Sequence, residues 1–282
     1  METLKHAFLR KFPENKIIFD YFLEANDCEC TWGNLTKLRL QRFVDYLQTR
    51  IAPNSVKTYC SKLKGILTQF NEEIQLPKDY QKVLQIRVDA SQHVYLNTEE
   101  IKRIIAYEPQ THAEHVIKNW FLIGCLTGAR HSDYIRFTES NIHDNELHYV
   151  SIKTHTQTIL PLSDYVRTLI RENARNGYNN VHYSDVYFNR LLHRICQNAG
   201  INEVVTLYTR GKFLTDEKWR FVASHTARRS FATNLYRNGV DIYTISKLCG
   251  HSGVEMTKQY ICCGANVNDN VLGYFRQFDD KE

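Results

Sequence analysis

The chain has 282 residues, of which 43% are hydrophobic and 24% are charged, so it holds enough apolar side chains for two domains with separate cores. No apolar run reaches the roughly eighteen residues that a membrane span needs, and the polar stretch after Met1 lacks the apolar centre of a signal peptide. We therefore expect a cytoplasmic protein without a membrane partner, while the formal net charge of +5 is too small to indicate nucleic-acid binding by itself.

Residues 1–85 have the apolar spacing of several short helices. Apolar side chains recur every three or four residues in the stretches 17–22, 38–47 and 56–67. A helical first domain is therefore predicted.

The segment from Lys37 to Lys64 has the strongest charge bias of the chain, with seven basic residues against the single acidic residue Asp45. The seven basic residues are Lys37, Arg39, Arg42, Arg50, Lys57, Lys62 and Lys64. On short helices such side chains can contact phosphates along one face of a DNA duplex, although an ordinary solvated helix face has the same composition. We predict that this segment binds double-stranded DNA.

Residues 86–94 have the composition of a linker, and a helix start follows them. The sequence Asn97-Thr98-Glu99-Glu100 precedes the apolar Ile101, with Asn97 or Thr98 as the expected capping residue. A second domain is therefore predicted from residue 95 onward.

An apolar helix leads into the segment Thr127-Gly128-Ala129-Arg130-His131-Ser132-Asp133. The apolar run at 116–124 predicts a buried helix, and Gly128 allows the chain to turn sharply at its end. The turn places the Arg130 guanidinium beside that helix end. Asp133, three residues later, is expected to meet Arg130 across one helical turn and orient it, or to be a carboxylate at a helix N-terminus.

A β-hairpin is predicted around Lys153. Residues 147–152 alternate in the pattern of a strand, and residues 159–162 have the composition of its partner after a polar turn. Lys153 is the only lysine between Lys118 and Lys212, and it falls near the tip of this hairpin. The alternative is a lysine in an ordinary solvated turn.

Two helices are predicted near the C-terminal end. His225 and Arg228 lie three residues apart at the start of the first helix, which would point both side chains at the same group. Gly239 is a stop signal for that helix, and residues 241–248 form the second, with an aspartate as its cap. His251 follows on a loop.

Arg130, Arg228 and Tyr260 have the chemistry needed to cut a phosphodiester. Guanidinium groups are planar and permanently charged, so the two arginines can bind the non-bridging phosphate oxygens in bidentate fashion. A tyrosine hydroxyl has a pKa of about 10 and is a weak nucleophile at neutral pH, so it needs help in losing its proton and in stabilising the charged transition state.

Three further residues can supply the proton transfers. His225 and His251 can accept, donate or share a proton near neutral pH, and Lys153 can return a proton to the departing 5′ hydroxyl. No metal or other cofactor is expected, because these groups suffice and the eight cysteines show no zinc-binding spacing with the histidines.

Four short motifs, at residues 127–133, 225–233, 248–252 and 257–260, resemble the tyrosine recombinase (phage integrase) family in type and order. The resemblance implies a fold that is mainly α with a small β-sheet in the catalytic domain. It also implies a two-domain DNA clamp, with a core-binding (SAM-like) domain over residues 1–85 and a catalytic domain over 95–262. The implied catalytic residues are Arg130, Lys153, His225, Arg228, His251 and Tyr260.

The resemblance further implies a nucleoid-associated, site-specific recombinase that joins Tyr260 to a 3′ phosphate and acts as a tetramer on two DNA sites. Integration, excision, inversion and dimer resolution all fit. Residues 263–282 are expected to form a tail helix with Leu272, Phe275 and Phe278 on its apolar face, docked on its own domain or in a neighbouring subunit.

Two other functions remain open. A type IB topoisomerase shares the tyrosine, arginine and lysine chemistry but relaxes DNA, and a tail able to dock in trans favours the recombinase. A catalytically silent DNA-binding factor is the second alternative, and suitable groups at all six positions argue against it.

Overall fold

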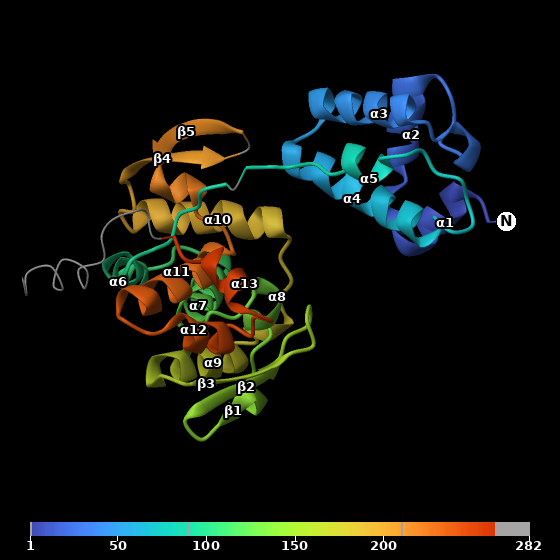
Figure 1. The fold of residues 1–282 in the computed structure, drawn as a ribbon. Helices are drawn as coiled ribbons and strands as arrows, with labels where there is room; N and C mark the ends of the chain where they lie inside the picture. Colours follow the sequence, from blue (N-terminus) through green and yellow to red (C-terminus); the bar gives the residue numbers. More distant parts are fainter. Residues whose placement is uncertain (1, 90, 210, 263–282) are drawn as a thin grey trace, which may run out of the picture. The chain divides into compact units, whose positions relative to one another are not determined.

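The computed structural model describes residues 2–89, 91–209 and 211–262 (Figure 1). Contacts within the chain define two compact units: Met1–Ser91 with Tyr208–Leu214, and Gln92–Leu207 with Thr215–Glu282. Each unit has a hydrophobic core of its own. The division near residue 91 falls inside the predicted linker, whereas the grouping of residues 208–214 with the first unit had no signal in the sequence.

The first unit is helical. Its elements are α1 (Leu4–Lys11), η1 (Pro13–Asn15), α2 (Ile17–Asn26), η2 (Trp32–Asn34), α3 (Lys37–Arg50), α4 (Pro53–Gln69) and α5 (Tyr80–Val83), where η denotes a 3₁₀ turn. Thr36 caps α3 through its hydroxyl, and Pro53 begins α4 at a position where no backbone N–H is needed. Phe22 and Phe43 pack together in the core. Helices α2, α3 and α4 confirm the three predicted helical stretches.

The second unit is built around α7. Its helices are α6 (Thr98–Ala106), α7 (His112–Thr127), α8 (His131–Tyr134), α9 (Asp164–Arg175), α10 (Asp185–Asn198), α11 (Thr226–Arg237), α12 (Ile242–Leu248) and α13 (Val254–Lys258), with 3₁₀ turns η3 (Glu139–Asn141), η4 (Tyr178–Asn180) and η5 (Lys218–Phe221). Helix α7 contacts α6, α8, α9, α10 and α11, which explains why nearly all of its side chains are buried (Figure 1). Asn97 caps α6 in a reciprocal pair with Glu100, as one of the two predicted capping residues.

Two small antiparallel sheets accompany the helices among the described residues. Strands β1 (Ile142–His143), β2 (Glu146–Val150) and β3 (Gln157–Pro161) form one sheet in that order, and β4 (Val204–Thr209) and β5 (Lys212–Glu217) form the other. The β2–β3 pair, with Leu147 opposite Leu160, confirms the predicted hairpin. Strand β3 also contacts α12, which brings the hairpin beside the helix that precedes His251.

The predicted fold class, mainly α with a small sheet in the second domain, is confirmed. The β4–β5 hairpin and the helices α5, α9 and α10 were not predicted. Within the described part of the chain, every helix is too short or too polar to cross a bilayer. The predicted tail helix lies outside the described residues.

Candidate active site

The end of α7 turns sharply and positions Arg130. Gly128 has a φ of +67°, a left-handed conformation that favours glycine, and a Cβ there would lie within 3 Å of the Phe231 ring. Two residues later Arg130 begins α8 as its N-terminal capping residue. Its side chain is buried and donates through Nη1 to the Ser151 hydroxyl at 3.0 Å, with a longer contact to Thr154 Oγ1 at 3.5 Å.

Asp133 holds the β2–β3 turn. Its carboxylate accepts from the Ser151 hydroxyl at 2.9 Å and from the Ile152 backbone N–H at 3.0 Å. The direct contact expected between Asp133 and Arg130 is not formed, because the Ser151 hydroxyl lies between them and bonds to both. Asp133 thus orients Arg130 through a residue of the β2–β3 hairpin. The sequence predicts this hairpin, but it does not predict its contact with Arg130 and Asp133.

Arg228 is the most deeply buried cation of the site, with 1% of its surface exposed. Nη1 donates to the Gly128 carbonyl at 2.6 Å and Nη2 to the Cys249 carbonyl at 2.7 Å. These carbonyls close the C-terminal ends of α7 and α12, so the negative ends of two helix dipoles stabilise the buried charge. The Nε–H of Arg228 is buried and has no partner among the described residues.

Neither Arg130 nor Arg228 takes part in any ion pair with a carboxylate in residues 2–89, 91–209 and 211–262. Two buried guanidiniums that are held by hydroxyl and carbonyl oxygens keep their positive charge available. A buried charge is costly unless it is paired, so this arrangement favours binding of an anion.

His251 follows α12 and stacks on Tyr260, with ring centroids 5.0 Å apart and an interplanar angle of 27°. Burial, together with the charges of Arg228 and Arg130, lowers the pKa of His251 to about 3, so the ring is neutral at neutral pH. Its Nδ1 is hydrogen-bonded to the Thr257 hydroxyl at 2.9 Å, and its buried Nε2 has no partner among the described residues.

Tyr260 comes just after α13 and lies against two arginines of α11. The guanidinium carbons of Arg228 and Arg229 lie 5.1 Å and 5.3 Å from the centroid of its ring. Arg229 also donates to the Gln259 carbonyl at 2.9 Å, and the Thr233 hydroxyl donates to the Tyr260 carbonyl at 3.3 Å. The segment that carries Tyr260 is therefore fastened to α11 of the same chain.

His225 and Lys153 lie at the edge of this cluster. His225 is the exposed residue before α11, and its pKa is lowered by partial burial and by the charges of Arg229, Arg228 and Lys153. Lys153 is exposed in the turn between β2 and β3. The charge of Lys153 is among the causes that lower the pKa of His225, which is consistent with a position of this turn near the cluster.

The sequence did not single out four residues that shape the site: Ser151, Thr257, Arg229 and Thr233. Thr257 stands in the motif that ends at Tyr260, yet nothing in its spacing indicates a contact with His251. Ser151 is recognisable in the sequence only as part of the alternating pattern of a strand.

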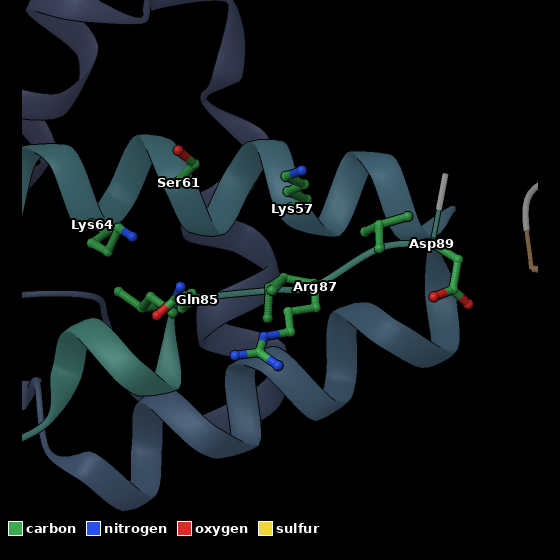
Figure 2. Close-up of a pocket in the computed structure, with 9 residues that line it drawn as sticks. Lys57, Ser61, Lys64, Gln85, Arg87 and Asp89 are labelled. Atoms are coloured by element: carbon green, nitrogen blue, oxygen red, sulfur yellow. The ribbon is translucent and has the colours of Figure 1, made fainter. Parts of the chain in front are cut away.

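The first unit has a basic groove between α4 and the segment after α5 (Figure 2). Lys57, Ser61 and Lys64 line it from α4 at helical spacings of four and three residues, and Arg87 lines it from the segment that runs beside α4. The groove is also lined by one acidic residue, Asp89. Two of the seven predicted DNA-binding residues therefore share this groove with Arg87, a residue of the predicted linker.

The other predicted basic residues are placed differently. Lys62 is not among the residues that line the groove and forms an ion pair with Glu14 at 2.8 Å. Arg39 donates to the Asn34 side chain at 3.0 Å, and Arg50 lies over the Tyr46 ring at 5.1 Å. Lys37 and Arg42 are exposed on α3. The seven residues thus do not form a single face.

Comparison with known proteins shows which family model and which proteins this chain is similar to. The model of the phage integrase family matches residues 94–264. The chain is 25% identical over 221 residues to a putative integrase of Pseudomonas phage Pf1, covering 76% of this chain and 60% of the relative. It is 24% identical over 204 residues to the tyrosine recombinase XerD of Staphylococcus haemolyticus, covering 66% and 61%. The chain spans about 60% of the length of these curated relatives.

Solved structures share its fold. A lambda integrase tetramer bound to a Holliday junction matches with a TM-score of 0.64 at 16% identity, covering 92% of this chain and 77% of that one. The Tn1549 transposon integrase in complex with a circular intermediate DNA matches with a TM-score of 0.68 at 12% identity, covering 98% and 100%. At such identities the likeness shows the fold alone. The family match, which extends over more than half of the sequence and includes every residue of the cluster around Tyr260, shows that the chain belongs to the phage integrase family.

Proposed function

We propose that this protein is a site-specific DNA recombinase that cuts and rejoins DNA through a covalent bond between Tyr260 and a 3′ phosphate. The observation that carries the proposal is the convergence of a tyrosine ring with two buried guanidiniums that have no carboxylate partner in an ion pair among the described residues. Membership of the phage integrase family and the names of the relatives, integrases and tyrosine recombinases, support it.

The two arginines bind the scissile phosphate. Negative charge builds up on the non-bridging oxygens as the phosphorane forms, and guanidiniums stabilise it best where water is excluded. The partnerless Nε–H of Arg228 is a donor already in place for such an oxygen. Arg130 reaches the same region, since its charge acts on His251 together with that of Arg228.

The tyrosine oxygen attacks phosphorus, and the bond from phosphorus to the 5′ oxygen breaks. The neutral imidazole of His225 is available to take up or share the phenolic proton. His251, whose low pKa makes it a weak base, is available to bond to the phosphate oxygens and to the phenolic hydroxyl. Lys153, on the turn between β2 and β3, gives a proton to the leaving 5′ oxygen. The reverse reaction with the 5′ hydroxyl of another strand completes the exchange, and neither a metal nor another cofactor takes part.

The partner is double-stranded DNA, held by phosphate contacts in the basic groove of the first unit as well as at the active site. Lys57, Lys64 and Arg87 supply three cations there. We propose a homotetramer on two DNA sites; the lambda integrase whose fold this chain shares is a tetramer bound to a Holliday junction.

Trapping of the covalent intermediate tests the proposal. A DNA duplex is first selected by its binding to the full chain and is then nicked close to the cleavage point. After cleavage the short fragment that carries the 5′ hydroxyl diffuses away. The reverse reaction is then impossible, and the enzyme stays attached to the DNA. The full chain should form a protein–DNA adduct in EDTA without nucleotide, and Tyr260→Phe should bind the duplex but form none. An adduct in the Tyr260→Phe variant, or none with the unaltered chain, contradicts the proposal. Relaxation of supercoiled plasmids that lack the selected duplex would favour a topoisomerase instead.

A further inference from the structure

Thr257 is a polar residue in the last turn of α13 that is fully buried, with 0% of its surface exposed. A buried hydroxyl normally has a hydrogen-bond partner, and that of Thr257 is Nδ1 of His251 at 2.9 Å. The bond spans six residues and joins α13 to the loop after α12. The bond therefore fixes the side chain of His251, which lies in a loop and not in a helix or strand.

This bond determines which nitrogen of His251 faces the substrate. An imidazole has two ring nitrogens, and a hydrogen bond to one of them fixes where the other points. The Thr257 hydroxyl can donate to Nδ1 or accept from it, so the bond sets the orientation of the ring. Because Nδ1 is bonded to Thr257, Nε2 is the nitrogen left for reaction, and it is buried without a partner among the described residues. The ring is also held flat against Tyr260.

The backbone of Thr257 is bonded to the turn that carries Tyr260. Its carbonyl accepts from the Tyr260 N–H at 2.9 Å and from the Ile261 N–H at 3.2 Å. One residue thus fixes the His251 ring through its side chain and the Tyr260 turn through its main chain. A change in either bond moves the two rings relative to each other.

We propose that Thr257 is a positioning residue that fixes the orientation of the His251 ring, with Nε2 directed at the phosphate that Tyr260 attacks. The inference rests on the proposed function and deepens it. The side chain of Thr257 touches neither substrate nor nucleophile in this role and acts only through His251.

Two substitutions separate the hydroxyl from the packing. Thr257→Val keeps the branched shape and removes the hydroxyl, whereas Thr257→Ser keeps the hydroxyl. Thr257→Val should form the covalent adduct about tenfold more slowly, as expected for the loss of one net hydrogen bond. Thr257→Ser should stay within about threefold of the unaltered chain, and both variants should bind DNA with unchanged affinity.

A double-mutant cycle with His251→Ala gives the sharper result. If Thr257 acts through the imidazole, Thr257→Val should have no further effect on the rate once His251 is alanine. An equal slowing by Thr257→Val in the presence and absence of the imidazole would mean that the valine acts through the packing of α13, and would overturn the proposal.

The bond itself can be observed in the free full-length chain by nitrogen-15 NMR of the histidine rings, with His251→Ala to assign the signal. The unaltered chain and Thr257→Ser should give the same Nδ1 chemical shift for His251, and Thr257→Val should change it. The same Nδ1 shift in all three contradicts the inference. This measurement needs no cleavage, so failure of the proposed function, seen as absence of the adduct, is distinguished from failure of the role of Thr257.

Discussion

Arg130 is held by the hydroxyl of Ser151, a residue of the neighbouring hairpin, at 3.0 Å. The same hydroxyl donates to Asp133 at 2.9 Å, so one oxygen separates the guanidinium from the carboxylate. A direct ion pair with Asp133 would neutralise the positive charge of Arg130 that is needed to bind a phosphate. The intervening hydroxyl keeps Arg130 oriented and leaves its charge available.

Ser151→Ala should therefore weaken both the fold and the reaction. Loss of the hydroxyl leaves buried groups on Arg130 and Asp133 without this partner, which costs about 1–3 kcal/mol in the free energy of unfolding. Adduct formation should slow by about tenfold or more. Thr156→Ala is the matched control, since among the described residues the Thr156 hydroxyl bonds to the Thr154 carbonyl alone, at 3.4 Å. Denaturant unfolding and adduct kinetics check both values, and equal effects of the two substitutions would refute the role of Ser151.

The local signals of the sequence predicted much of this fold. Asn97 and Asp241 cap the helices that they were expected to cap, because a capping side chain bonds to backbone only two or three residues away. Gly128 and Gly239 follow the ends of helices with positive φ as expected, because few other residues adopt that conformation. Such features depend on neighbours in sequence and can be recognised without the fold.

The features that the sequence did not predict are of two kinds. Some depend on partners that lie far apart in the sequence, and others lack the alternating pattern by which a strand is recognised. Ser151 lies 21 residues from Arg130, so no short motif contains both. Strands β4 and β5 have no fully buried side chain, so the alternation that indicates a strand is missing. The different positions of Lys57 and Lys62 could have been predicted, since five residues turn a helix by about 140°. The count of basic residues between Lys37 and Lys64 did not take this rotation into account.

The neutral histidines make the fold sensitive to acid. His251 has a pKa of about 3 in the folded chain against 6.5 for a free imidazole. Between these values the unfolded chain binds a proton that the folded chain does not, so the free energy of unfolding falls as the pH is lowered from 6.5. His251→Gln removes this proton and should make the fall less steep, by at most about 1.4 kcal/mol per pH unit. Denaturant unfolding between about pH 6.5 and 5 measures the difference; identical slopes would contradict the lowered pKa.

The groove of the first unit predicts how DNA affinity depends on salt. Removing one cation that neutralises a phosphate should reduce the slope of log affinity against log salt by about one. Lys57→Ala and Arg87→Ala should each show this reduction, because both side chains line the groove. Lys62→Ala, on the other side of α4, should leave the slope unchanged, since Lys62 is paired with Glu14. Fluorescence anisotropy of a labelled duplex at several salt concentrations gives the three slopes, and an equal reduction in all three would place the DNA elsewhere.

Lys153 is expected to act on the leaving group, unlike the arginines. If its ammonium protonates the 5′ oxygen, Lys153→Ala should form the adduct about a hundredfold or more slowly, the usual contribution of a general acid. A duplex with sulfur in place of the bridging 5′ oxygen should restore the rate, because a thiolate leaves without protonation. Arg130→Ala should not be rescued, because the charge on the non-bridging oxygens stays unbalanced whichever atom departs. Adduct kinetics on the two substrates check this, and equal rescue of both variants would show that Lys153 contributes charge and no proton.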